Sequence, residues 1–190
     1  MKQARSQGMR ARSVFKLEQI DKKFQLIKPH SKIVDLGSAP GSWSQYAATR
    51  VAGENRIVSV DLLPMQEIAN VEFVHGDFTD GQIRQRMIDC FCNSKIDLVL
   101  SDMAPNITGI RITDQANAEQ LQNAILEFCL KVLNLRGNLL TKLFEGESTG
   151  LVRKKFSNHF KQVQMIKPDA SRSESKEIYL LARGFSPCTN

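Results

Sequence analysis

The sequence predicts an α/β fold, a parallel sheet with helices on both faces. An apolar run at 33–36 is followed by a small-residue turn at 37–41 and then by a helical pattern, which is the first unit of such a fold. Further apolar runs alternate with helical stretches along the rest of the chain. With 190 residues, 42% hydrophobic and 24% charged, the chain has the size and composition of one globular domain.

The turn Gly-Ser-Ala-Pro-Gly at 37–41 indicates a nucleoside-type ligand. Its glycines allow the backbone to approach a ligand closely, and Asp61 follows the next apolar run, where such folds bind ribose hydroxyls. Pro40 offers no N–H to a pyrophosphate, and the Gly-Lys-Ser/Thr of a P-loop is missing. S-adenosylmethionine therefore fits better than NAD or ATP. The alternative is an ordinary strand–turn–helix unit without a ligand.

An amphipathic helix is predicted before the first strand. Ser13 is its expected N-cap, and its apolar residues from Val14 to Phe24 recur at helical spacing. Lys16 falls in the first turn, where the helix dipole favours anions rather than cations. This suggests a specific role for Lys16, although a solvated lysine is the simpler interpretation.

The middle of the chain continues the alternation. Ser42 is the expected cap of the second helix, and strands are expected at 56–60 and 71–75. After the second of these strands, Asp77 and Phe78 could hold and cover an adenine, or Asp77 could simply cap a loop. A helix is expected at 82–91 and a strand at 96–100, in that order.

The second half places two charged residues at strand ends. Asp102 follows strand 96–100 at the edge where open α/β sheets bind ligands. Lys142 lies in the apolar strand 139–144, and a buried lysine requires a partner. The other expectations are a polar loop at 109–117, a helix ending before 136–138, a helix at 150–160, an edge strand at 163–166, a polar loop at 167–176 and a last strand at 177–182 that begins with Glu177.

Charge is segregated along the chain. Residues 1–32 carry a net charge of +7, residues 33–152 carry −6, and residues 153–190 carry +5. A basic head and tail around an acidic middle indicate a polyanionic partner, most often nucleic acid. The simpler alternative is that the basic ends are only solvated. Residues 1–12 are expected to form a flexible basic arm.

Other classes of protein are disfavoured by composition. The four cysteines include no Cys-x-x-Cys pair and the three histidines are scattered, so we expect neither a metal site nor a disulfide framework. No apolar run is long enough to span a membrane, and no signal peptide is visible. We therefore expect a cytoplasmic protein that makes no contact with membranes.

Several motifs together resemble the FtsJ/RrmJ family of methyltransferases. They are Asp-Leu-Gly-Ser-Ala-Pro-Gly-Ser-Trp at 35–43, Asp-Leu-Leu-Pro-Met at 61–65, Gly-Asp-Phe at 76–78, Ser-Asp-Met-Ala-Pro-Asn at 101–106 and Lys-Pro-Asp-Ala-Ser-Arg at 167–172. The resemblance implies a single Rossmann-like class I domain over residues 1–190. Its sheet would be seven-stranded and mostly parallel, with the last strand antiparallel.

The resemblance also implies site residues. The family's Lys-Asp-Lys-Glu tetrad falls on Lys16, Asp102, Lys142 and Glu177, with Lys142 as our hypothetical proton acceptor. A free lysine has a pKa near ~10.4, so that role requires desolvation or a nearby positive charge. Cofactor-binding positions fall on Gly41, Trp43, Asp61, Asp77 and Asp102, and the surrounding motifs add Gly37, Ser38, Pro40 and Phe78.

The implied activity is S-adenosylmethionine-dependent 2′-O-methylation of a uridine in 23S rRNA on the 50S subunit, by a monomer. The alternatives are 2′-O-methylation of another RNA, such as tRNA or an mRNA cap, and a ribosome-assembly factor that only binds RNA. Base methylation is disfavoured because neither an Asn/Asp-Pro-Pro-Tyr/Phe loop nor a cysteine at a strand end is present.

Overall fold

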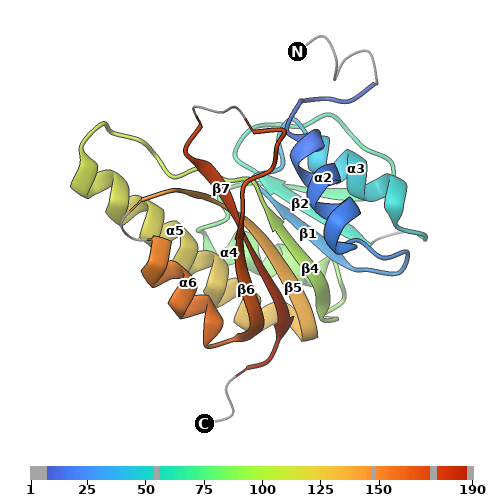
Figure 1. Ribbon diagram of the computed structural model, residues 1–190. Coiled ribbons are helices and arrows are strands. Elements are labelled where there is room, and N and C mark those ends of the chain that lie inside the picture. The colour runs from blue at the N-terminus through green and yellow to red at the C-terminus, as the bar shows by residue number, and fades with distance from the viewer. Residues whose placement is uncertain (1–7, 54–55, 147–148, 172–174, 188–190) are drawn as a thin grey trace.

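The computed structural model, which describes residues 8–53, 56–146, 149–171 and 175–187, contains one seven-stranded sheet with strand order β3-β2-β1-β4-β5-β7-β6 (Figure 1). Strand β7 is antiparallel to both of its neighbours, and the other pairs are parallel. This confirms the predicted fold class. The strands are β1 (Ile33–Leu36), β2 (Ile57–Asp61), β3 (Val71–His75), β4 (Ile96–Ser101), β5 (Leu133–Phe144), β6 (Phe160–Ile166) and β7 (Glu177–Phe185).

Helices cover both faces of the sheet. Helices α2 (Val14–Phe24) and α3 (Ser42–Arg50) pack on one face, with Trp43 and Tyr179 in their apolar core. On the other face, α4 (Gly81–Asp89), α5 (Arg111–Val132) and α6 (Thr149–Ser157) enclose a second core that contains Phe128 and Phe156. Residues of one strand alternate between these two cores, as the period of two requires.

The register of the central strands brings distant residues together at one edge. Leu36 of β1 pairs with Val60 of β2 and with Ser101 of β4, and Ser101 pairs with Thr141 of β5. The residues that follow them, Gly37, Asp61, Asp102 and Lys142, therefore lie in one row at the carboxyl ends of the parallel strands. Lys142 in turn pairs with Tyr179 of β7.

Two predicted boundaries around α5 are wrong. The expected polar loop at 109–117 is helical from Arg111 onward. Asp114, an acid in the first turn of the helix, accepts hydrogen bonds from the amides of Thr108 and Gly109 and so fixes the segment that leads into α5. Residues 136–138 do not separate helix from strand either. Strand β5 begins at Leu133, and the irregularity appears instead in its pairing with β4. Ile96 of β4 pairs with Leu133, whereas Leu98 pairs with Asn138, so the register shifts between them.

Smaller differences concern caps and ends. The Ser13 side chain caps no amide but lies 2.7 Å from the Ser42 hydroxyl, and the N-cap of α3 is Gly41 rather than Ser42. Helix α6 is shorter than the predicted 150–160 at its carboxyl end, while β6 and β7 extend beyond 163–166 and 177–182. None of the described helices is long and apolar enough to cross a lipid bilayer.

Candidate active site

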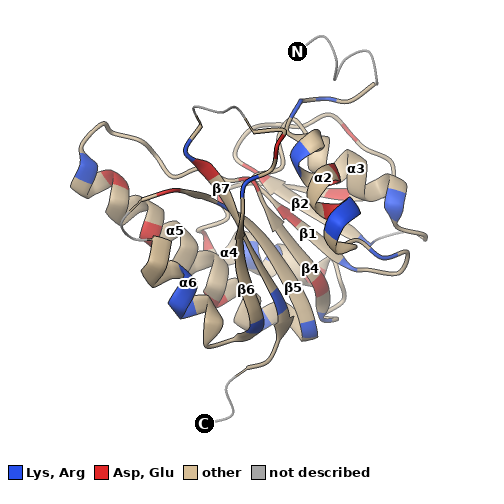
Figure 2. Cartoon of the chain, in the orientation of Figure 1, with Lys and Arg blue, Asp and Glu red and all other residues tan. Residues whose placement is uncertain are grey.

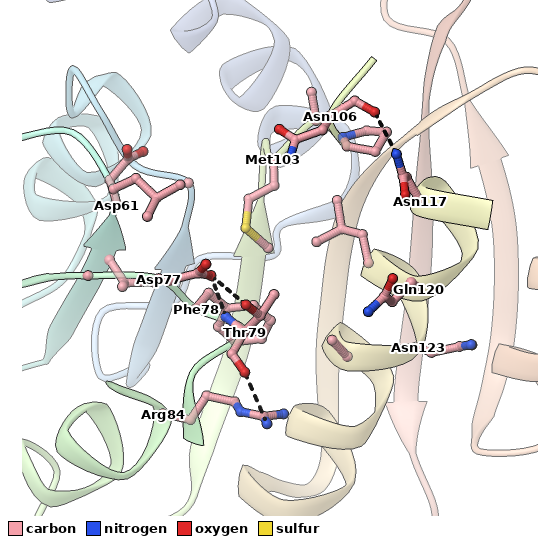
Figure 3. Close-up of a pocket in the computed structure, with 18 of the residues that line it drawn as sticks. Asp61, Asp77, Phe78, Thr79, Arg84, Met103, Asn106, Asn117, Gln120 and Asn123 are labelled. Atoms are coloured by element: carbon pink, nitrogen blue, oxygen red, sulfur yellow. Dashed lines mark hydrogen bonds between the residues drawn. The ribbon is translucent and has the colours of Figure 1, made fainter. Parts of the chain in front are cut away.

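A pocket of about 780 Å³ lies at the carboxyl ends of β1, β2 and β4 (Figure 3). One wall comes from the loops after β2 and β3, and the opposite wall comes from α5. Four of its charged lining residues are acids, Asp61, Asp77, Asp102 and Glu127, and Arg84 is the basic one. The pocket therefore has a negative potential, which favours a cationic ligand and disfavours phosphates.

The first strand–helix turn approaches the pocket closely through Gly37. Its φ is 73°, and a Cβ at this position would lie 2.4 Å from Cγ of Met103. The Met103 side chain extends into the pocket between the Asp77 wall and the α5 wall, as Figure 3 shows. A larger residue at 37 would displace Met103 or close this part of the pocket.

Asp61 and Asp77 shape the loops that line the pocket. Asp61 accepts hydrogen bonds from the amides of Ala39 and Leu63, each at 2.8 Å, and so joins the glycine turn to the loop after β2. Asp77 accepts bonds from the amide and hydroxyl of Thr79, which is the loop-capping arrangement considered from the sequence (Figure 3). Both residues also line the pocket, so loop capping and ligand binding are compatible.

The predicted cofactor residues divide into two groups. Gly37, Asp61, Asp77, Phe78 and Asp102 line the pocket, whereas Ser38, Pro40, Gly41 and Trp43 are not among its lining residues. Phe78 is largely buried and meets Phe128 edge-on, with ring centroids 5.4 Å apart.

The second group lies behind the pocket. Trp43 is buried, and its indole N–H donates to the carbonyl oxygen of Ser13 at 2.9 Å. A Cβ at Gly41 would lie 2.6 Å from Sδ of Met65, in the loop after β2, so this glycine leaves room for that loop rather than for open space. The sequence therefore located the turn, but only part of it faces the pocket.

The tetrad Lys16, Asp102, Lys142 and Glu177 forms two adjoining ion pairs. Nζ of Lys16 lies 2.7 Å from Oε2 of Glu177, and Nζ of Lys142 lies 3.2 Å from Oδ1 of Asp102. The Lys142 ammonium also donates to the backbone oxygen of Asp102. Both lysine side chains are nearly buried, so each needs the partner that it has.

Tyr179 links these two pairs and was missed by the sequence analysis. It is fully buried, its hydroxyl donates to Oδ1 of Asp102 at 2.9 Å, and Nζ of Lys16 lies 5.8 Å from its ring centroid. Burial, followed by the charge and hydrogen bond of Asp102, raises the pKa of Tyr179, so it remains a donor. The available signal was the period of two in β7, which puts residue 179 on the same face as Glu177.

Glu177 stays charged in this setting. Burial by itself raises the pKa of Glu177, but the hydrogen bond and charge of Lys16 and the charge of Lys142 together lower it. The Ser175 hydroxyl donates a further bond to the same carboxylate. The pKa of Glu177 is thus held low enough for it to remain the anionic partner of Lys16.

A further carboxyl group, Asp35, lies beneath the site in β1. One of its oxygens accepts a bond from Ser44 at 2.6 Å, and the other has no hydrogen-bond partner among the described residues. Burial, and then the charges of Asp102 and Asp61 against the Ser44 bond, raise the pKa of Asp35 to about 7.

Arg10 lies in the segment expected to be a flexible arm, of which residues 1–7 are outside the described part. Its guanidinium donates to the carbonyl oxygens of Pro40, Gln66 and Glu67 at 3.1, 2.8 and 2.7 Å. These three bonds tie the glycine turn to the loop after β2, next to Gly41. Arg10 thus has structural contacts that its position in a basic arm did not suggest.

Comparison with known proteins agrees with this architecture. Residues 9–185 match the family model described as FtsJ-like methyltransferase. Proteins named ribosomal RNA large subunit methyltransferase E are 44% identical in Legionella pneumophila, over 98% of this chain and 90% of the relative, and 43% identical in Marinobacter nauticus, over 97% and 89%. A solved Plasmodium falciparum structure, named as a ribosomal RNA methyltransferase, superposes with a TM-score of 0.81 at 27% identity, over 93% of this chain and 98% of that one. The chain therefore belongs to the FtsJ-like family and is an enzyme of the methyltransferase class.

Proposed function

We propose that this protein transfers a methyl group from S-adenosylmethionine to the ribose 2′-hydroxyl of a uridine in 23S rRNA. The observation that carries this proposal is the position of Asp102, which lines the pocket and also holds Lys142 of the tetrad. A methyl donor in the pocket and an acceptor hydroxyl at the tetrad would meet at this residue. Such positioning is the main requirement of a displacement at carbon.

The pocket suits the proposed cofactor by its charge. S-adenosylmethionine supplies a transferable methyl group on a positively charged sulfur, and it carries no phosphates. Asp61, Asp77 and Asp102 surround the space with negative charge, while Gly37 lets the backbone come close. In this proposal Asp61, at the end of β2, accepts bonds from ribose hydroxyls, and Asp77 and Phe78 contact the base; all three residues line the pocket.

The tetrad suits an acceptor hydroxyl that must lose a proton. Lys142 is the candidate proton acceptor, because two contacts hold its Nζ next to Asp102. It would take the hydroxyl proton as the neutral amine, after its own proton has left to solvent. Lys16 and Glu177, paired with each other beside Lys142, are candidates to orient the ribose. Tyr179 donates to the same oxygen of Asp102, Oδ1, and so helps to fix this carboxylate.

The RNA substrate is supported by the relatives and by charge. The curated relatives are named as ribosomal RNA large subunit methyltransferases, and both ends of this chain are strongly basic. We propose the assembled 50S subunit as the substrate, and a monomer acting in the cytoplasm. A factor that only binds RNA would have no need of two ion pairs built into strand ends beside a ligand pocket.

The test is methyl transfer from labelled S-adenosylmethionine to 50S subunits from cells that lack the activity, with free 23S rRNA assayed in parallel. The modified nucleoside is then identified. We expect 2′-O-methyluridine, in an RNA that resists alkaline cleavage at that position. A methylated base would contradict the proposed chemistry, and methylation of tRNA or capped mRNA alone would contradict the proposed substrate.

A further inference from the structure

Two adjoining hollows of about 450 and 340 Å³ lie at the opposite end of the sheet from the pocket. Their linings share four residues, Leu26, Lys28, Arg136 and Asn138, so they form one depression, the amino-end groove. It is bounded by the segment after α2, by the start of β5 and by the edge pair β6–β7. Figure 2 shows Lys and Arg residues at this lower end of the β5–β7–β6 region.

The groove is lined by four cations that have no counter-ion among the described residues. The side chains of Lys28, Arg136, Lys161 and Arg183 make no hydrogen bond or ion pair with any described residue. Asp97 is the acid among the described lining residues, and its oxygens already accept bonds from the amide of Lys32 and the side chain of Asn134. The four positive charges are therefore available to an external anion.

The backbone of Arg136 adopts an energetically unfavourable conformation. Its φ is 66°, a left-handed conformation that glycine or asparagine adopts more easily than arginine. The next residue, Gly137, has no room for a side chain, because a Cβ there would lie 2.9 Å from the backbone oxygen of Asn134. An arginine kept in such a conformation, exposed at the surface, suggests that its side chain is used.

The stem of Lys161 lies against the backbone of Gly184, where a Cβ would come within 3.4 Å of it. This packing holds the stem of the lysine in the hollow that Arg136 also lines. Arginine guanidinium and lysine ammonium groups are the side chains that most often bind the phosphates of a nucleic-acid backbone.

The groove and the tetrad are joined by β5 but cannot contact the same nucleotide. Arg136 and Lys142 are six residues apart on this strand, which is roughly 20 Å at the usual rise of a strand. An RNA held at both places must present two separate segments, as a folded RNA can.

Resting on the proposed function, we infer that the amino-end groove is a second RNA-binding surface, which takes backbone phosphates of a segment of the folded substrate distant from the methylated ribose. It contributes affinity chiefly through contacts to phosphates, because four of its lining residues are cations, whereas its aromatic rings are the exposed His30 and the half-buried Phe24.

The test compares two double variants that each remove one arginine and one lysine. In Arg136→Gly/Lys161→Ala the groove is weakened, while in Arg153→Ala/Lys154→Ala exposed charges of α6 on the other side of the sheet are lost. Binding to 50S subunits and to 23S rRNA is measured over a range of salt concentrations. We expect the groove variant to lose roughly tenfold or more in affinity at ~0.1 M salt, and its log–log salt slope to fall by about 2.

Other measurements separate this inference from loss of folding and from the proposed function. Arg136→Gly relieves the left-handed backbone, so its melting temperature should not fall, and kcat at saturating RNA should stay unchanged in the groove variant. Equal salt slopes in the two double variants would contradict RNA binding by the groove and would not affect the proposed methyltransferase function. The wild-type protein could bind these RNAs with a steeper salt slope than the groove variant and yet methylate neither. That result would support RNA binding by the groove and contradict the proposed function.

Discussion

The tetrad and the pocket adjoin at Asp102, yet their charges are organised in opposite ways. The tetrad holds two lysines and two acids in contacts of 2.7 and 3.2 Å, on helix α2 and at the ends of β4, β5 and β7. The pocket holds four acids against Arg84, of which Asp77 and Asp102 lie on loops after strands, Asp61 ends β2 and Glu127 lies on α5. One region is electrostatically complete, and the other requires a cation.

This difference predicts separable effects. Side chains of the tetrad are already in place, so changes there should lower turnover and leave cofactor affinity nearly intact. Changes at residues that shape the pocket should alter cofactor affinity. Changes that remove negative charge near it should alter the free energy of unfolding. The following predictions test this division, from the largest expected effect to the smallest.

Lys142→Ala should lower kcat by about 10²–10⁴-fold, the usual contribution of a group that handles a proton in the transition state. The dissociation constant for S-adenosylmethionine, measured by calorimetry, should change by less than about threefold. Lys154→Ala, an exposed lysine on α6, is the matched control and should keep full activity. Loss of cofactor binding in parallel with activity would show that Lys142 serves the pocket instead.

Asp35→Asn should change how stability depends on pH. The pKa of Asp35 in the native state is about 7, above its ordinary value of 3.8, so the native state binds a proton that the unfolded chain releases. The stabilisation by this group is complete below pH ~4 and is lost as pH rises through about 7. The loss amounts to about 4 kcal/mol at most.

Asparagine keeps an acceptor for Ser44 but does not ionise. The free energy of unfolding is measured with urea for Asp35→Asn and for the wild type. The value for the variant should rise relative to the wild-type value between pH 4 and pH 7, and the difference between the two should be constant above pH 8. Parallel curves throughout that range would mean that Asp35 is already ionised at pH 4. Asp114→Asn is a useful control, since hydrogen bonds from Thr108 lower the pKa of that exposed carboxylate instead.

Much of the site was predictable because its charges stand out against their surroundings. Lys142 in an apolar strand and Asp102 after another strand are conspicuous, and the edge where parallel strands end is known in advance. Tyr179 was not predictable in the same way, because a tyrosine in an apolar strand is compatible with ordinary core packing. Its role depends on register with Lys142, which only the paired sheet reveals.

The errors share a physical origin in contacts between side chains and backbone. Asp114 in the first turn of α5 accepts bonds from the amides at 108 and 109, and a polar stretch that is ordered by such bonds looks like a loop in the sequence. Arg10 resembles any cation of a basic arm until its three carbonyl partners, 30 or more residues away, are known. Propensity and periodicity carry no information about such long-range bonds.

Tyr179→Phe should lower kcat by about two- to tenfold, the value of one hydrogen bond to Asp102, while the ring keeps its packing against Trp43. Tyr46→Phe is the matched control, because its hydroxyl donates to Asp21 at 3.0 Å, outside the pocket and the tetrad. The control should lose stability and keep kcat. An unchanged kcat for Tyr179→Phe would show that Lys142 alone fixes the Asp102 carboxylate.

Arg10→Ala should weaken S-adenosylmethionine binding by about three- to tenfold with kcat at saturating cofactor nearly unchanged. The substitution removes the three bonds that hold the loop after β2 against the glycine turn, and Leu62 of that loop lines the pocket. Arg12→Ala is the matched control from the same segment, since its exposed side chain makes no hydrogen bond or ion pair with any described residue. Cofactor affinity should distinguish the two variants in calorimetry, whereas RNA affinity should fall in Arg12→Ala. Should both variants lose only RNA affinity, the bonds of Arg10 would contribute nothing to the pocket, and the segment would act solely as a basic arm.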